Sequence, residues 1–238
     1  MFTLNDILKP TLLILIAIFV LYIYNHLVVK DLKLCCDNTA ENYSHYDLVV
    51  GILSSRGNFD LRQSLRESWV GYARRHSSLN KRLSATLSFS FVMKTDDDCF
   101  VNLETILQEM ESHNLKNTSK LWWGSFRTDW LIERQGKWAE PDYPGVAYPT
   151  FACGAGSIIS SDIVHWLAKN EKSLKRYQGE DVSMGIWLSA IAPEIYKDER
   201  WSCFGDCQME MFTLPEQDAD SLLYLWENFM SCGNPCKC

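Results

Sequence analysis

The sequence predicts an α/β protein whose mixed sheet is flanked by helices and preceded by one transmembrane helix. Residues 48–53 (LVVGIL) form a run typical of a buried parallel strand, and a turn and a helical stripe follow it. Residues 87–93 form a second β-type run that leads into three aspartates. With 238 residues and 47% hydrophobic content, the chain is long enough for one substantial core.

The amino terminus is typical of a membrane anchor rather than a cleaved signal peptide. Residues 11–29, taken as a helix, reach about 28 Å, close to the hydrocarbon thickness of a thin bilayer. No small-x-small cleavage site follows the run, and Lys30 and Lys33 flank it. The predicted organisation is a short cytoplasmic tail at 1–10, an anchor at 11–29, a stem at 30–46 and a folded domain at 47–238.

Sequons and cysteines indicate the secretory lumen. Asn42 and Asn117 both begin an N-glycosylation acceptor pattern. Disulfides are favoured over a zinc knuckle because the paired cysteines lack the two-residue spacing and no histidine follows His165. The count of nine cysteines leaves one thiol over, for which Cys99 and Cys153 are the candidates. The predicted disulfide cysteines of the tail are Cys203, Cys207, Cys232, Cys236 and Cys238.

Charge and composition narrow the function classes. The net charge of −7, with no cluster of Lys and Arg, argues against a nucleic-acid surface. The chain carries 9 Trp, 10 Tyr and 11 Phe, most of which we expect in the core, although sugar-binding clefts also use flat aromatic faces.

The aspartate triplet at 96–98 is the strongest local signal. Three adjacent carboxylates repel one another, and at the carboxyl end of a strand they suit a divalent cation that carries a diphosphate. A calcium loop is excluded because Val101 and Leu107 stand where glycine and glutamate are needed, and Phe100 argues against a phospho-aspartate. A metal-diphosphate site and a solvated acidic turn remain as alternatives.

A helix follows the first strand and its turn. Its apolar stripe is Leu61, Leu65, Trp69 and Tyr72. Arg62, Arg66 and Arg74 fall largely off this stripe and form either a solvated face or a diphosphate clamp. Only 26 residues separate Trp69 from Asp96, fewer than a complete strand-helix-strand unit needs, so the domain is predicted to be shortened between 70 and 90.

Further elements are expected downstream. The pattern predicts a helix at 101–112, a strand at 121–126, a long loop at 135–149 and a helix at 163–168. The small residues of 151–159 indicate a backbone that approaches something closely. Glu180 and Asp181 begin another helix, where they either compensate the helix dipole or include a general base.

Four motifs occur together in this order: KTDDD at 94–98, GKW at 136–138, YPTFACGAG at 148–156 and GEDV at 179–182. The set resembles the β-1,3-glycosyltransferase family of the endomembrane system, from residue 91 to the carboxy terminus and again over 48–69. Cys153, the run 178–187 and the cysteine-rich tail most resemble members that transfer N-acetylgalactosamine (GalNAc).

The resemblance implies a fold of the GT-A type, with a Rossmann-like mixed sheet, in an inverting, manganese-dependent enzyme. Such an enzyme moves GalNAc from UDP-GalNAc in β-1,3 linkage to a terminal N-acetylglucosamine (GlcNAc), as in O-mannosyl glycans of dystroglycan. It implies a single-pass type II protein of the Golgi or endoplasmic reticulum membrane with a luminal catalytic domain.

The resemblance also implies residue roles. The metal ligands would be Asp96 and Asp98, and the base Asp181, or Glu180 if the register differs. The donor or diphosphate contacts would be Arg66, Lys94 and Asp97. The substrate contacts would be Trp123, Lys137, Gly154, Gly156 and Trp187.

Three departures from the family pattern leave other functions open. Ser157 stands where the family usually has an aromatic residue, no late histidine supplies a further metal ligand, and the interval before Asp96 is short. One alternative is a β-1,3-galactosyltransferase. The other is a catalytically inactive, shortened homologue that acts as a luminal binding module.

Overall fold

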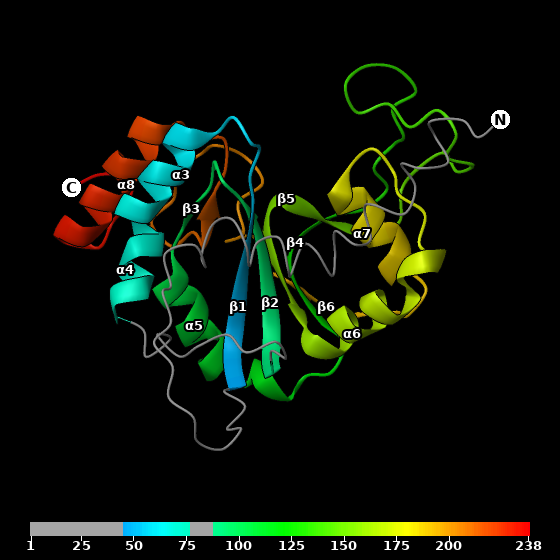
Figure 1. Cartoon of the computed structure of the whole chain (residues 1–238), viewed down its shortest axis with the longest axis horizontal. Helices are drawn as coiled ribbons and strands as arrows, with labels where there is room; N and C mark the ends of the chain where they lie inside the picture. The colour runs from blue at the N-terminus through cyan, green and yellow to red at the C-terminus, as the bar shows by residue number, and fades with distance from the viewer. Residues whose placement is uncertain (1–44, 77–87) are drawn as a thin grey trace, which may run out of the picture.

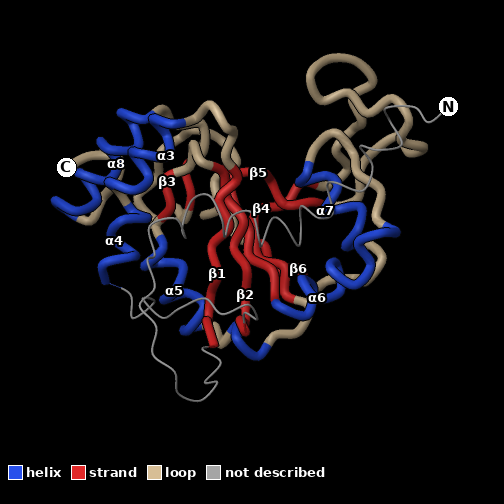
Figure 2. The backbone as a smooth tube through the Cα atoms, in the orientation of Figure 1, coloured by secondary structure: helices blue, strands red, loops and turns tan. Residues whose placement is uncertain are grey.

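The computed structural model describes residues 45–76 and 88–238. In this part of the chain a five-stranded sheet has the strand order β1-β2-β5-β4-β6 (Figures 1 and 2). The strands are β1 (His45–Leu53), β2 (Ser88–Asp96), β4 (Leu121–Arg127), β5 (Phe151–Ser160) and β6 (Glu194–Lys197). The pairs β1–β2 and β4–β6 are parallel, whereas β5 is antiparallel to both of its neighbours. The predicted mixed α/β sheet is therefore confirmed.

Helices cover both faces of this sheet, as Figure 1 shows. On one side lie α3 (Phe59–Glu67), α4 (Trp69–His76), α5 (Leu103–Ser112) and α8 (Ala219–Cys232), with the short pair β3 (Phe100–Val101) and β7 (Thr213–Leu214). On the other side lie α6 (Ser161–Asn170) and α7 (Glu180–Leu188). Single 3₁₀ turns occur at Leu115–Asn117 and Glu171–Ser173. The predicted flanking helices are thus present.

The two faces of the sheet belong to two separate hydrophobic cores, because neighbouring residues of a strand point to opposite faces. Phe91 and Met93 of β2 join the core beneath α3, α5 and α8, while Val92 joins the core beneath α6 and α7. In β4, Trp123 and Trp122 divide in the same way. Each buried strand therefore stabilises both layers of helices.

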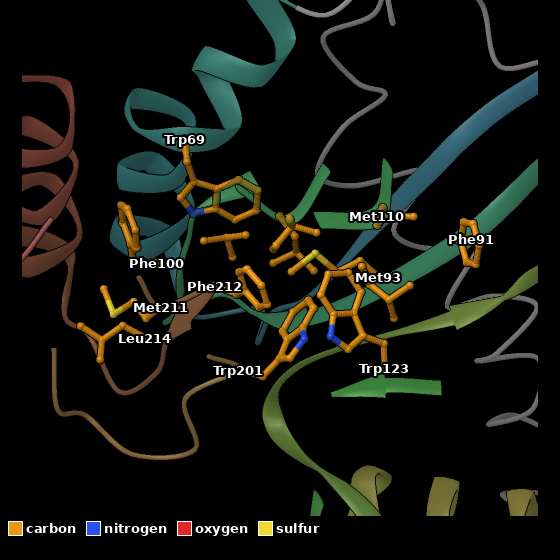
Figure 3. Close-up of a cluster of buried hydrophobic side chains, with 14 of the residues drawn as sticks. Trp69, Phe91, Met93, Phe100, Met110, Trp123, Trp201, Met211, Phe212 and Leu214 are labelled. Atoms are coloured by element: carbon orange, nitrogen blue, oxygen red, sulfur yellow. The ribbon is translucent and has the colours of Figure 1, made fainter. Parts of the chain in front are cut away.

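Aromatic rings fill the first of these cores (Figure 3). Trp123 meets Trp201 and Phe212 edge to face, with ring centroids 5.2 Å apart in both pairs. Its side chain is 0% exposed. Burial of this much aromatic surface, together with edge-to-face contacts, is a main source of stability for the fold.

Several element boundaries differ from those predicted. The helix expected from residue 101 begins at Leu103, because β3 pairs with β7 and the Asn102 Oδ1 caps the helix by accepting from the Thr105 amide. The helical stripe that starts at Leu61 is divided between α3 and α4 at Ser68. β1 begins at His45, two residues before the predicted start of the folded domain at 47.

The small-residue segment at 151–159 is the strand β5, in the middle of the sheet. A Cβ added at Gly156 would lie 3.1 Å from the rings of Trp201 and from Thr213. Glycine there lets the Trp201 indole pack directly against the strand, which explains the expected close approach.

The described residues form three disulfides: Cys153–Cys203, Cys207–Cys236 and Cys232–Cys238. All five tail cysteines are therefore paired, as predicted. The thiol of Cys99 is free and buried, which confirms one candidate, whereas Cys153 is not the free thiol because it bonds to Cys203. Burial raises the pKa of the Cys99 thiol, so it stays protonated and inert.

Some predictions fall outside the described residues. The predicted anchor at 11–29 and the sequon at Asn42 lie there, and so does most of the interval predicted to be shortened, since residues 77–87 are not described. Within 45–76 and 88–238, no helix is both long and apolar enough to cross a bilayer. Asn117 is exposed, as an acceptor asparagine must be.

Candidate active site

Three segments that are far apart in the sequence meet at one point. These are the carboxyl end of β2 with Lys94 and Asp96, the strand β5 at Gly154, and the first turn of α7 with Glu180. The ammonium of Lys94 contacts all of the other three residues. The aspartate triplet and the Glu180–Asp181 pair, predicted separately from the sequence, thus belong to one site.

The acidic segment is held in place by the loop after β1. The Asn58 amide donates to both carboxylate oxygens of Asp97, at 3.1 and 3.0 Å, and the Asp97 backbone N–H donates to the Leu53 carbonyl at 2.9 Å. Asp97 is 5% exposed. Its carboxylate is therefore engaged in bracing the turn, where we had predicted a donor contact.

Asp98 is anchored through its backbone and keeps its side chain partly exposed. The Asp98 carbonyl accepts a hydrogen bond from the Gln217 amide at 2.9 Å. Its Oδ1 accepts a weak hydrogen bond from the thiol of the buried Cys99 at 3.5 Å. Among the described residues, no ion pair engages this carboxylate.

Asp96 carries an incompletely satisfied carboxylate. Its Oδ1 is buried and lies 3.1 Å from Lys94 Nζ as an ion pair, but no hydrogen bond of good geometry reaches it from the described residues. Desolvation, together with the charges of Glu180 and Asp98, raises the pKa of Asp96 to about 6 against the opposing effect of Lys94. A buried oxygen without a hydrogen bond of good geometry is available to interact with a ligand.

Lys94 is nearly enclosed, with a side chain 16% exposed. Its Nζ donates to the Gly154 carbonyl at 2.7 Å and to Glu180 Oε1 at 2.8 Å. Burial alone would lower the pKa of Lys94, but the carboxylates of Asp96 and Glu180 outweigh burial and raise it. The ammonium is consequently charged at any physiological pH.

Two glycines allow α7 to present its carboxylates. A Cβ at Gly185 would lie 2.6 Å from the Phe151 Cβ, so glycine lets the helix pack closely on β5. A Cβ at Gly179 would lie 2.6 Å from Asp181 Oδ1, which folds back to accept from the Val182 amide at 2.7 Å. Close packing of the helix and a tight first turn together fix where Asp181 lies.

The two carboxylates of α7 differ in basicity. Burial by itself would raise the pKa of Glu180, but its ion pair with Lys94 and its backbone hydrogen bonds lower it. Burial and the neighbouring charge of Glu180 raise the pKa of Asp181. Asp181 is therefore the stronger base of the two, and the choice between Asp181 and Glu180 as the catalytic base stays a prediction.

The carboxylates of Asp96 and Asp98 are suitable ligands for a hard cation that would also bind a diphosphate. Among residues 45–76 and 88–238, no group of three or more His, Cys, Asp or Glu side chains is arranged to hold a metal by itself. Magnesium-like ions are commonly held by one or two carboxylates and completed by phosphate oxygens and water. The buried Oδ1 of Asp96 suits that arrangement.

Gly154 leaves room beside this carboxylate. A Cβ at this position would lie 3.6 Å from Asp96 Oδ2 and 3.8 Å from Lys94 Nζ, so the glycine keeps the approach to the carboxylate open. The predicted substrate contact of Gly154 stays a prediction.

Other predicted site residues lie in different surroundings. Trp123 is fully buried and cannot contact a sugar as it lies, and Gly156 faces Trp201. Trp187 is buried, and its Nε1 donates to the Lys175 carbonyl at 2.6 Å. Trp123 is thus a core residue, whereas the substrate contacts predicted for Gly156 and Trp187 stay predictions.

Lys137 and Arg66 are not among the residues that contact Lys94. Lys137 is exposed, with its ammonium 4.4 Å from the centroid of the Trp138 ring, and its carbonyl accepts from Gln178, two residues before Glu180. Arg66 lies in the last turn of α3, about 12 Å along the helix axis from the cap residue Asn58. The substrate contact predicted for Lys137 and the donor contact predicted for Arg66 both stay predictions.

The sequence reasoning missed two contributors. Asn58 fixes Asp97, and the available signal was its place in the turn after a buried strand. The Cys153–Cys203 disulfide ties the residue next to Gly154 to the segment after Trp201, and no local pattern could pair two cysteines 50 residues apart.

Comparison with known proteins identifies the family. A family profile described as galactosyltransferase matches residues 61–199, which is more than half of the 238 residues. The chain belongs to the galactosyltransferase family. The resemblance to β-1,3-glycosyltransferases predicted from the four motifs is thereby confirmed.

Individual relatives support this assignment to the galactosyltransferase family. UDP-GalNAc:beta-1,3-N-acetylgalactosaminyltransferase 2 of Xenopus tropicalis is 50% identical over 151 residues, covering 63% of this chain and 31% of the relative. The Homo sapiens protein of that name is 48% identical over 153 residues, covering 64% and 30%. Beta-1,3-galactosyltransferase 6 of Mus musculus is 26% identical over 192 residues, covering 77% and 58%. The alignment thus spans less than a third of the length of the N-acetylgalactosaminyltransferase relatives.

Proposed function

We propose that this protein is an inverting, manganese-dependent glycosyltransferase of the GT-A type that transfers GalNAc from UDP-GalNAc in β-1,3 linkage to a terminal GlcNAc of a glycoprotein glycan. The observation that carries the proposal is the convergence of Asp96, Lys94 and Glu180, which places a candidate metal carboxylate beside the helix that presents Asp181. The names of the most similar relatives support GalNAc as the donor sugar.

In this mechanism Asp181 removes the proton from the acceptor hydroxyl. The acceptor oxygen then forms a bond to the anomeric carbon from the face opposite UDP, and the bond from that carbon to the diphosphate oxygen breaks with its electron pair leaving on UDP. Asp96 and Asp98 would hold the manganese ion, which supplies Lewis-acid stabilisation of the diphosphate leaving group. Burial of Asp181 and the charge of Glu180, which together raise the pKa of Asp181, favour proton uptake.

The remaining residues of the site orient these groups. Asn58 fixes the turn that carries Asp97, and Gly154 keeps the approach to Asp96 open. Gly185 holds α7 against β5, so that the base keeps a constant position relative to the metal carboxylates.

The decisive experiment measures sugar transfer to a β-GlcNAc acceptor by the full-length chain and by its Asp98→Ala and Asp181→Asn variants. Each protein is tested with UDP-GalNAc and with UDP-galactose as donor, in the presence and absence of Mn²⁺. We expect GalNAc transfer that requires Mn²⁺ and falls at least about a hundredfold in Asp181→Asn, because proton transfer by a positioned base contributes about 10²–10⁴ in rate. Asp60→Asn, on the exposed start of α3, is the control.

Each other outcome points to one alternative. Preferred use of UDP-galactose would replace the proposal by a β-1,3-galactosyltransferase, a choice supported by the match to the mouse enzyme over 77% of this chain. Absence of transfer and of UDP binding would favour an inactive binding module. Full activity of Asp98→Ala would overturn the metal assignment.

The compartment is part of the same proposal. We place the protein in the Golgi or endoplasmic reticulum membrane as a single-pass type II protein with a luminal domain that acts on O-mannosyl glycans of the dystroglycan type. Three disulfides among the described residues and the exposed Asn117 support a luminal domain. Protection of the domain from protease in intact microsomes tests this orientation, and digestion there would overturn it.

A further inference from the structure

The ammonium of Lys94 spans the two sides of the site. It joins Asp96, at the end of β2, to Glu180, in the first turn of α7, and both acidic residues lie within 3.1 Å of Nζ. These two acidic residues are 84 positions apart in the chain. We infer that Lys94 is a positioning residue that ties the base helix α7 to the metal carboxylate Asp96, and that it does not bind the donor diphosphate.

The first step of the argument is the hydrogen-bonding capacity of Lys94. An ammonium has three N–H donors. Two of them donate to the Gly154 carbonyl and to Glu180, and the Asp96 ion pair lies on the remaining side. With three oxygens around Nζ and a side chain only 16% exposed, a phosphate oxygen would have to displace one of these partners.

The second step concerns α7. Ser183 stabilises its first turn through two hydrogen bonds. The Ser183 backbone N–H donates to the Gly179 carbonyl at 3.0 Å, and the Ser183 hydroxyl accepts from the Tyr177 backbone N–H at 3.1 Å. No side-chain hydrogen bond caps the helix at Gly179. The Glu180–Lys94 pair is therefore a direct side-chain link from this first turn to the central sheet, and it positions Asp181, the next residue.

The third step is electrostatic. A cation on Asp96 would lie close to the Lys94 ammonium, and like charges repel. Lys94 therefore weakens metal binding by charge while it orders the helix by contact. Removal of the ammonium should leave the affinity for metal and UDP intact or raise it, whereas a diphosphate clamp would lower the affinity for UDP when removed.

The inference rests on the proposed function, so its test includes readouts that do not depend on transfer. The full-length chain, Lys94→Met and Lys94→Arg are compared in three measurements. These are calorimetric titration with UDP and Mn²⁺, hydrogen-deuterium exchange over 179–188, and the steady-state kinetics of transfer. Lys116→Met is the matched control, because Lys116 pairs with Asp47 at 3.1 Å on the surface.

For Lys94→Met we expect UDP and Mn²⁺ affinities within threefold of wild type or tighter, at least tenfold faster exchange of the first turn of α7, and a fall in kcat with little change in the KM for the donor. Lys94→Arg should restore part of the exchange protection. A tenfold loss of UDP affinity with unchanged exchange would overturn the inference and establish a diphosphate clamp.

A second variant guards against misfolding of Lys94→Met. Glu180→Ala removes the same link at a side chain that is 57% exposed, so the fold should persist. It should also speed exchange in α7 without loss of UDP affinity, and unchanged exchange would count against the tether. If no chain transfers sugar but exchange responds as expected, the tether stands and the proposed function fails.

Discussion

Two clusters in this protein place one cation between two carboxylates, and they differ in how fully the charges are satisfied. Lys94 lies between Asp96 and Glu180, and Asp96 retains a buried oxygen without a good hydrogen bond from the described residues. Arg200 lies between Asp198 and Glu109. The Lys94 cluster is part of the candidate active site. The Arg200 cluster lies among the helices and loops on one face of the sheet.

Geometry explains the difference. The Arg200 guanidinium donates to both oxygens of Asp198, at 2.9 and 2.6 Å, and to Glu109 at 3.1 Å, and it stacks 4.2 Å from the Phe212 ring. These hydrogen bonds raise the pKa of Arg200, those to Asp198 first. The planar guanidinium donates to both oxygens of one carboxylate at once, whereas the Lys94 ammonium contacts one oxygen of each carboxylate. The comparison indicates that the Arg200 cluster stabilises the fold and that the Lys94 cluster keeps an acceptor for a ligand.

The largest expected effect is on the Arg200 side. Arg200→Met removes the guanidinium partner of the mostly buried carboxylates of Asp198 and Glu109, which should lower the free energy of unfolding by about 3 kcal/mol. Urea denaturation followed by circular dichroism measures the change. The exposed Arg75→Met is the control, with an expected change within about 0.5 kcal/mol. A larger loss in Lys94→Met than in Arg200→Met would reverse the comparison.

A smaller effect on stability, of opposite sign, is expected at Asp96. Asp96→Asn should abolish most Mn²⁺ binding, seen as free Mn²⁺ by electron paramagnetic resonance, while the free energy of unfolding stays unchanged or rises by about 1 kcal/mol. The reason is that the pKa of Asp96 is raised to about 6 in the folded state, so its ionised form is disfavoured by folding.

The sign can be checked by pH. Because the folded pKa of Asp96 exceeds its ordinary value, this group adds stability as pH falls from about 6 towards 4 and removes it as pH rises through that range. At pH 5 the Asp96 carboxyl of wild type is largely protonated, so Mn²⁺ should bind more weakly than it does above pH 6. Asp47→Asn, at a carboxylate 58% exposed, serves as control. A loss of more than about 2 kcal/mol in Asp96→Asn would contradict the interpretation.

The two clusters also show what a sequence can predict. Asp96 follows a β-type run and Glu180 begins an apolar helix, so local pattern located both correctly. Their meeting through Lys94 depends on β5 lying between β2 and β4, a long-range pairing that no local pattern contains. The contacts of Lys94 with Glu180 and Gly154, and the pairing of Cys153 with Cys203, could therefore not be predicted from local pattern.

Trp123 shows a different limit. The alternation of Leu121, Trp122 and Trp123 along one strand predicts that two of them share a face, but not that both faces are buried. An aromatic residue near a sugar-binding motif was thus taken for a cleft residue although it belongs to the core. Burial on both sides of a sheet follows from which helices cover it, and this is settled only by the tertiary fold.

Two glycines of β5 should respond differently to an added methyl group, and the smallest expected effect on stability is that of Gly154→Ala. Gly154→Ala places a methyl group 3.6 Å from Asp96 Oδ2, an ordinary contact, so the fold should keep its stability while Mn²⁺ affinity falls severalfold because the approach to the carboxylate narrows. Gly156→Ala places it 3.1 Å from Trp201 and should lower the free energy of unfolding by about 1–3 kcal/mol through overpacking. Gly57→Ala, with no atom within 4 Å, controls for both. Equal effects of Gly154→Ala and Gly156→Ala on stability would mean that the space beside Asp96 is part of the packed core and not an opening for a ligand.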